Sequence, residues 1–285
     1  MKPPAFVYHA PETLAEALDV LAEVGDDGKV LAGGQSLVPI LNMRLAAPEH
    51  LVDINRVAGL STVDTSGSAV TVRATARHAD IERDDAAYRV QPLLRRALRL
   101  VAHPAIRNRG TTVGSLAHAD PAGEMTAVLA LTGGRVRLTS SSGHRDVAAA
   151  EFFLGPLECC LRAGELVESA TFPAFDPGTG SAFVELARRH GDYALCGVAA
   201  AVTVVDGVVS AARAAYISVG PTPLVLDLTD AVVTRPLPHA DWTAAGRLAQ
   251  SQVSPEADIH ATASYRRHLV GVLTARALAE AALVA

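Results

Sequence analysis

The sequence feature that most restricts the fold is a pair of adjacent glycines between a short apolar segment and a run of apolar residues at helical spacing. Val30 to Ala32 is typical of a strand, Gly33-Gly34-Gln35-Ser36 follows, and the spacing from Leu37 to Leu45 predicts a helix. Glycine lets backbone N–H groups approach an anion, and the N-terminus of the next helix adds partial positive charge. The segment therefore predicts a phosphate site. It matches neither the dinucleotide fingerprint nor the P-loop, so a plain tight turn remains the alternative.

The first 55 residues predict one small unit around this loop. Thr13 and Glu16 form a capping box ahead of apolar residues at helical spacing, which stop at Gly25. Leu51 to Ile54 predicts another strand after the second helix. We therefore expect a β-α-β-α-β unit over residues 1–55.

The middle of the chain predicts a hairpin, a helix and a second glycine-bearing loop. Ser61 to Asp64 and Val70 to Thr75 flank a Ser-Gly-Ser turn, and the apolar spacing predicts a helix over residues 90–101. Residues 109–115 contain glycines and hydroxyl side chains, and Asp120 is placed to cap the helix that follows. Two such loops flanking one cleft could hold both phosphates of a dinucleotide.

The last third of the chain predicts a separate domain. Five turn-forming residues from Asp176 to Gly180 predict a linker. Beyond them, Asp206-Gly207 separates two β-branched runs, which is a strong hairpin signal. Residues 261–283 predict a terminal helix. We expect an α+β chain whose C-terminal domain spans residues 181–285.

The charged residues and cysteines exclude several kinds of chemistry. A net charge of −5 argues against a nucleic-acid partner. Lys2 and Lys29 are the only lysines, which leaves little room for Schiff-base chemistry or a P-loop. Three cysteines, Cys159, Cys160 and Cys196, are too few for an iron–sulfur centre or a four-thiolate zinc site, and their odd number favours a reducing compartment.

Two other kinds of site are poorly supported. His118 and Asp120, with Ser36 or Ser115, are the residue types of a hydrolase triad. The sequence lacks the Gly-x-Ser-x-Gly motif that presents the nucleophilic serine in such enzymes, so this site is poorly supported. The same pair lacks the further ligands of a metal site, so we expect no metal. The start lacks an apolar signal region and no apolar stretch is long enough to span a bilayer, so we expect a cytoplasmic protein without a membrane span.

Five ordered blocks of sequence resemble the FAD-binding subunit of molybdenum hydroxylases, most closely the medium subunit of the carbon monoxide dehydrogenase type. A more distant resemblance is to the flavin domain of xanthine dehydrogenase. The blocks are residues 32–37 with Arg44-Leu45 and Asp53-Ile54-Asn55, residues 107–124, residues 164–167, residues 189–194 and residues 265–269. The resemblance runs over essentially the whole chain and is more specific than either glycine loop alone.

The resemblance implies a two-lobed FAD-binding domain of the PCMH or vanillyl-alcohol-oxidase type. Its lobes would span residues 1–55 and 56–175, and the C-terminal domain would contain an antiparallel sheet and helices.

The resemblance also implies the residues that bind FAD. They are Ala32, Gly33, Gly34, Gln35, Ser36, Leu37, Thr111, Gly114 and Ser115 at the pyrophosphate, Glu124 and Val167 at the rest of the cofactor, and His118 and Asp120 at the flavin end. Tyr193 is implied to lie over the flavin as the catalytic residue. Without the resemblance, its polar stretch is equally well an ordinary surface loop. FAD is expected to bind without a covalent bond.

The implied function is electron transfer within a complex. A molybdopterin-binding large subunit would oxidise the substrate, a [2Fe-2S] small subunit would relay single electrons, and FAD would pass them to an external acceptor, in a dimer of heterotrimers. The low cysteine count agrees with this division, because the chain cannot hold the clusters itself. A free-standing FAD oxidoreductase and a non-catalytic scaffold of the same fold remain alternatives.

The chain departs from the family pattern in its second loop. Related loops usually have two adjacent glycines, whereas here Val113 precedes Gly114. A Cβ at this position narrows the room for the backbone to approach a pyrophosphate, so we expect a local difference in geometry.

Overall fold

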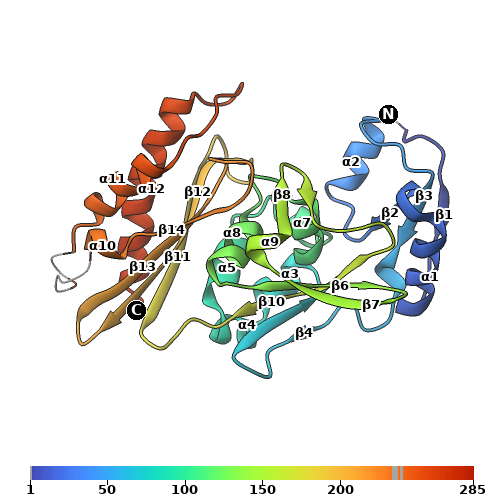
Figure 1. Cartoon of the computed structure of the whole chain (residues 1–285), viewed down its shortest axis with the longest axis horizontal. Helices are drawn as coiled ribbons and strands as arrows, with labels where there is room; N and C mark the ends of the chain where they lie inside the picture. Colours follow the sequence, from blue (N-terminus) through green and yellow to red (C-terminus); the bar gives the residue numbers. More distant parts are fainter. Residues whose placement is uncertain (1, 233–236, 238–239) are drawn as a thin grey trace.

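The N-terminal segment forms the expected β-α-β-α-β unit in a computed structural model that describes residues 2–232, 237 and 240–285 (Figure 1). Its elements are β1 (Val7–His9), α1 (Leu14–Val24), β2 (Gly28–Leu31), α2 (Leu37–Asn42) and β3 (His50–Asp53), with 3-10 turns at Gly25–Asp27 and Ile54–Arg56. The strands are parallel in the order β1-β3-β2. Thr13 and Glu16 form the predicted capping box. α2 ends earlier than predicted, and Arg44 just beyond it has a left-handed backbone with φ of 58°.

A five-stranded antiparallel sheet with several helices forms the next part of the chain. Its elements are β4 (Val63–Asp64), β5 (Ala69–Arg73), α3 (His78–Arg83), α4 (Asp85–Val90), α5 (Pro92–Leu98), α6 (Pro104–Arg107), α7 (Thr112–His118), α8 (Glu124–Leu131), β6 (Arg135–Ser140), β7 (Gly143–Ala148), α9 (Ala149–Phe152), β8 (Phe153–Gly155), β9 (Glu158–Cys159) and β10 (Leu166–Pro173). The sheet order is β4-β5-β10-β6-β7, so the last strand returns to the centre. The predicted hairpin of β4 and β5 is confirmed.

The prediction of a single helix over residues 90–101 is wrong, because two helices, α4 and α5, meet at Gln91. α4 ends at Val90, and Gln91 leaves the helical conformation and caps α5 by accepting a hydrogen bond from the Leu93 amide. Pro92 explains the break, because it has no N–H to continue α4 but fits the first position of a new helix.

The predicted helix cap at Asp120 is also wrong. Its Oδ1 accepts a hydrogen bond from the Ala122 amide at 2.8 Å inside a turn, and α8 begins only at Glu124 with Gly123 as its N-cap. The carboxylate therefore stabilises the turn that leads into the helix.

The C-terminal part is a four-stranded antiparallel sheet with helices on one face (Figure 1). Its elements are β11 (Thr179–Ala187), β12 (Ala194–Val205), β13 (Val208–Ile217), β14 (Leu224–Asp227), α10 (Thr229–Val232), α11 (Trp242–Gln252) and α12 (Ala263–Ala282). The Asp206-Gly207 hairpin is confirmed, and both residues have the positive φ that this turn requires. The α+β class and the antiparallel C-terminal sheet are as expected. The predicted linker is shorter, because β11 already begins at Thr179.

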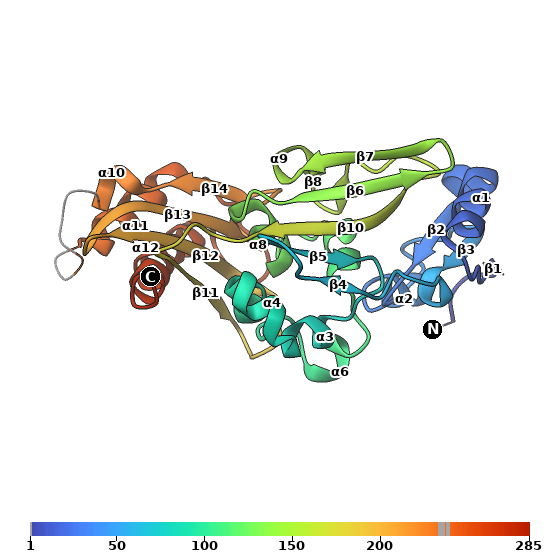
Figure 2. The same ribbon diagram turned by 90° about the horizontal axis from the view of Figure 1, so that it is seen from below.

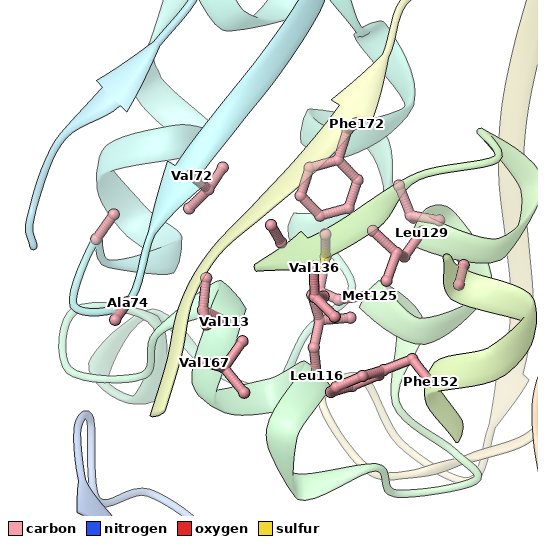
Figure 3. Packing of buried hydrophobic residues seen from close by; sticks show 14 of the residues in the cluster. Val72, Ala74, Val113, Leu116, Met125, Leu129, Val136, Phe152, Val167 and Phe172 are labelled. Atoms are coloured by element: carbon pink, nitrogen blue, oxygen red, sulfur yellow. The ribbon is translucent and has the colours of Figure 1, made fainter. Parts of the chain in front are cut away.

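The C-terminal sheet lies between two hydrophobic cores. Residues such as Ala182 and Val198 pack toward α11 and α12, whereas Phe183, Ala199 and Ile217 belong to the core of the preceding part. Figure 3 shows that preceding core around α7, α8 and β10. Figures 1 and 2 place the N-terminal unit at one end of the molecule and the C-terminal helices at the other, with the five-stranded sheet between them.

Close packing of α11 on α12 depends on one glycine. A Cβ on Gly246 would lie 2.3 Å from the carbonyl oxygen of Gly271. We predict that Gly246→Ala lowers the free energy of unfolding by about 1–3 kcal/mol, because the helices must move apart. Gly67→Ala is the matched control, since Gly67 has no atom within 4 Å of the added carbon. Equal midpoints of urea unfolding for the two variants would contradict the prediction.

Candidate functional site

The two glycine-bearing loops lie in direct backbone contact. A Cβ on Gly33 would lie 2.4 Å from the carbonyl oxygen of Arg109, 2.8 Å from Cα of Gly110 and 3.0 Å from the amide nitrogen of Thr111. Residue 33 follows β2, and residues 109–111 lead into α7. The absence of a side chain at Gly33 therefore lets the two loops meet.

A hydrogen-bond network holds this contact in place. Asn55 Nδ2 donates to the carbonyl oxygen of Ala32 at 2.8 Å, and Arg77 Nη2 donates to Asn55 Oδ1 at 2.6 Å. Arg77 Nη1 also donates to the carbonyl oxygen of Arg109 at 2.6 Å. One guanidinium thus connects the end of β3 with the second loop. Charge-assisted bonds of this kind are stronger than neutral ones.

Sequence analysis assigned no binding role to Asn55 or Arg77. A signal for Asn55 was present, because Asp53-Ile54-Asn55 belongs to the first block of the family resemblance. In the structure, β2 and β3 are parallel and their carboxyl ends meet at one edge of the sheet. Arg77 had no such signal. Its position depends on an isolated bridge to Thr111, which only the folded chain shows.

A pocket of about 340 Å³ opens beside the first loop. Its lining comes from both sides of the loop contact and consists of Leu31, Ala32, Gly33, Gly34, Gln35, Val38, Pro39, Asp53, Asn55, Ile106 and Arg109. Within the described residues, the amide groups of Gly34, Gln35 and Ser36 make no hydrogen bond. Gly34 has a φ of 72°, which a residue with a side chain rarely adopts. The pocket thus offers free amide donors to an anion.

The second loop presents one face of α7 to the first loop. Thr111 caps α7 by accepting a hydrogen bond from the Gly114 amide at 3.1 Å. A Cβ on Gly114 would lie 2.4 Å from Thr111 Oγ1 and 3.8 Å from Cβ of Ala32. Ser115 and His118 are half-buried on the same side of the helix, and the charge of Lys29 on β2 acts on His118. The start of α7 therefore lies beside Ala32 of the first loop, with Ser115 and His118 further along the helix.

The structure places Val113 in the core. The residue is 2% exposed and packs with Leu116 and Val167 (Figure 3). The predicted effect of its Cβ on the approach of a pyrophosphate stays a prediction. The Val167 side chain is 4% exposed in the same core, so that only its backbone is available to a ligand.

Four polar side chains gather at the end of α7 and the start of α8. His118 Nε2 lies 3.9 Å from Asp120 Oδ2, and burial lowers the pKa of His118. Burial raises the pKa of Glu124, the first residue of α8, to about 7. The Tyr193 side chain is 69% exposed, yet desolvation and then the charges of Asp120 and Glu124 raise its pKa. Tyr193 therefore lies exposed, near enough to Asp120 and Glu124 to be affected by their charges.

Metal and membrane sites find no support in the described residues. No group of three or more His, Cys, Asp or Glu residues is close enough there to hold a metal ion. Among the same residues, no helix combines the length and the apolar character that a bilayer crossing needs.

Family models cover nearly the whole chain. A model described as the FAD binding domain in molybdopterin dehydrogenase matches residues 4–175. A second model, described as the CO dehydrogenase flavoprotein C-terminal domain, matches residues 181–281.

Curated relatives and solved structures agree with these models. The chain is 38% identical over 283 residues to the 6-hydroxypseudooxynicotine dehydrogenase complex subunit alpha of Paenarthrobacter nicotinovorans, covering 99% of this chain and 96% of the relative. It is 39% identical over 285 residues to the caffeine dehydrogenase subunit beta of Pseudomonas sp. (strain CBB1), covering 99% and 96%. A chain of carbon monoxide dehydrogenase from Hydrogenophaga pseudoflava superposes with a TM-score of 0.93 at 36% identity, and each chain is covered completely.

A buried histidine beneath the second loop gives a testable pH dependence. The His78 amide donates to the carbonyl oxygen of Gly110, and His78 Nδ1 lies 3.0 Å from Thr112 Oγ1. Burial, with a smaller effect of the Arg107 charge, lowers the pKa of His78 from 6.5 to about 4. Between about pH 4 and pH 6.5, the unfolded chain therefore binds a proton at His78 and the folded chain does not. The free energy of unfolding then decreases as the pH falls below 6.5.

Between pH 7 and pH 5, we predict that the free energy of unfolding of the wild-type protein falls by about 2 kcal/mol more than that of the His78→Asn variant. Urea unfolding of both proteins at each pH measures this difference, and the comparison cancels all other titrating groups. Parallel pH profiles for the two proteins would contradict a neutral, buried His78.

Proposed function

The chain belongs to the FAD-binding medium subunits of the molybdenum hydroxylase family, and from this premise we propose that it accepts single electrons from a [2Fe-2S] small subunit onto FAD and passes them to an external acceptor. A molybdopterin-binding large subunit oxidises the substrate in the same complex, and the complex is a dimer of heterotrimers. The observation that carries the proposal is the contact between the two glycine loops at Gly33, with free amide groups beside it. That arrangement suits a ligand with two linked phosphates.

The residues present fit the pyrophosphate of FAD. Ala32 to Leu37 supply glycine backbone and unbonded amides, and Gly114 lies beside Ala32, with Thr111 and Ser115 in the same segment. We assign these residues to the pyrophosphate. Glu124 and the Val167 backbone are assigned to the rest of the cofactor.

The flavin end is assigned to the cluster of His118, Asp120 and Tyr193. Bound FAD supplies the ability to take up electrons one at a time and to release them as a pair. Tyr193, exposed near Asp120 and Glu124, would lie over the flavin and limit the direction from which an acceptor approaches. The cofactor is held without a covalent bond. Cys196, the nearest cysteine in sequence to Tyr193, is fully buried in the core under α11 and α12.

We also propose the domain boundaries and the compartment. An FAD domain with lobes over residues 1–55 and 56–175, followed by a C-terminal domain over 181–285, is supported by the separate core beneath α11 and α12. A cytoplasmic location is supported by three cysteines that form no disulfide among the described residues.

Replacing Gly33 tests the cofactor site. We predict that Gly33→Val or Gly34→Val abolishes retention of FAD, because the new side chain separates the two loops or opposes the positive φ of Gly34. Gly67→Val, in an open turn, should retain FAD fully. Flavin absorbance after gel filtration measures retention, and release of the flavin on acid precipitation checks noncovalent binding. Normal flavin content in both loop variants would remove these glycines from the site.

The role of Tyr193 gives a separate prediction. Tyr193→Ala should change the rate at which external acceptors reoxidise the flavin several-fold, while the rate of reduction by the partner cluster stays within experimental error. Stopped-flow measurement of the two half-reactions in the assembled complex separates these effects. A change confined to the reductive half-reaction would refute the assignment.

Co-purification distinguishes the subunit from a free-standing oxidoreductase. The tagged chain, expressed with the genes that neighbour its own, should bring down one molybdenum-containing and one [2Fe-2S] protein. Substrate-dependent turnover by the single chain, with no metal detected, would favour the free-standing enzyme.

A further inference from the structure

A glutamate on the C-terminal sheet points into the interface with the preceding part of the chain. Glu185 on β11 pairs with Gly197 on β12, which pairs with Ile217 on β13. Paired residues project from the same face of a sheet. Ile217 and Phe183, two residues before Glu185, belong to the core of the preceding part, so Glu185 faces that core as well. The opposite face packs on α12.

Glu185 has no compensating partner. Among the described residues it makes no hydrogen bond or ion pair, and its Oε2 is buried without a partner. Gly197 lets the side chains of Ile217 and Glu185 approach each other across it, since a Cβ there would lie 2.7 Å from Ile217 Cγ1 and 3.4 Å from Cβ of Glu185. An isolated buried carboxylate is costly, so the carboxyl keeps its proton to a higher pH.

Glu124 approaches the same place from the other side of the interface. The turn before α8 is fixed to the sheet by a hydrogen bond from the Ser218 amide to the carbonyl oxygen of Pro121 at 2.8 Å. Burial raises the pKa of Glu124 to about 7. Burial and then the charge of Glu124 raise the pKa of Glu185 to about 8. Ser218 follows Ile217, which lies in register with Gly197 and Glu185, so the bond from Ser218 to Pro121 brings the start of α8 toward Glu185. The ionisation of one carboxyl group then opposes that of the other.

The charged groups on the surrounding elements do not neutralise this pair. Asp120, before α8, adds negative charge that raises the pKa of Glu124. Arg266 of α12 is bonded to two carbonyl oxygens and to Asp258, and Arg96 of α5 approaches Ser181 Oγ at 3.4 Å. Tyr193 carries a neutral hydroxyl at physiological pH.

We propose that Glu124 and Glu185 form a buried acid pair that takes up a proton when negative charge arrives in the cleft and releases it when that charge leaves. The inference rests on the proposed function for the source of the charge, which is electrons delivered one at a time by the iron–sulfur partner. An O–H bond forms at a carboxylate oxygen with a proton from water as electrons enter the site, and it breaks when they leave for the acceptor. Glu185 is a positioning residue here, because it acts through Glu124.

The acid pair itself is tested on the full chain without flavin. Infrared spectra across a pH titration should show a protonated carboxyl group that persists at pH 7 and is lost as the pH rises through about 8. Glu185→Gln, with little change of volume, should remove the part of this signal that is lost near pH 8 and leave the part that Glu124 loses near pH 7. Glu124→Gln should shift the loss of the Glu185 signal to lower pH. Glu151→Gln, at an exposed position, is the control and should change nothing. Absence of a protonated carboxyl at pH 7 in wild type would overturn the proposal, whether or not the chain binds FAD.

The coupling to electrons is tested on the flavin-loaded chain. The midpoint potential of the bound flavin should fall more steeply with pH between about 7 and 8 in wild type than in Glu185→Gln. Glu185→Asp, which keeps a carboxyl group, should restore part of the steeper slope. Identical slopes in wild type and Glu185→Gln would reject proton coupling. Failure to bind flavin at all would instead count against the proposed function and leave the infrared result standing.

Discussion

The contact between two backbone segments at Gly33 is the constraint on which the site depends. The first loop ends a parallel β-α-β unit and the second begins a helix of the antiparallel part, so nothing in their local sequences requires them to meet. They meet because position 33 has no side chain, and because Arg77 bridges Asn55 and the Arg109 carbonyl. The free amides of the first loop and the open face of α7 are then on opposite sides of one cleft. A larger residue at position 33 would separate these donors without disturbing either core.

The C-terminal sheet has a second, less obvious role in forming the site. It carries its own core against α11 and α12, and its other face completes the core around α8. Through this face it brings Tyr193, just before β12, and Glu185, on β11, toward the residues between α7 and α8. The flavin end that we propose would therefore be incomplete without the C-terminal sheet.

Local signals in the sequence predicted much of this fold. The capping box of α1, the Asp206-Gly207 turn and the apolar pattern of α12 each depend on neighbours within a few residues. The errors arose where a nearby residue outweighed the pattern, as at Pro92, or where a cap stabilised a turn instead of a helix, as at Asp120. The positions of Arg77 and Glu185 could not be predicted, because they depend on contacts between segments far apart in the chain. The resemblance to a family pointed to the two glycine loops, whereas the burial of Val113 in the core depends on how the start of α7 packs.

The buried titratable groups around the site act on stability in opposite directions. His78 has a lowered pKa, so its burial costs more as the pH falls below 6.5. Glu124 and Glu185 have raised pKa values, so the folded chain binds more protons than the unfolded chain above pH 4.5, and their burial costs more as the pH rises toward 8. Between pH 4.5 and 6.5 the two effects oppose each other. The cost of the acid pair is already present at neutral pH and grows until the pH passes about 8, and the protein gains nothing in stability from it. A pair that is kept at such a cost, next to a cleft suited to a charged cofactor, is better explained by proton exchange with that cleft than by packing.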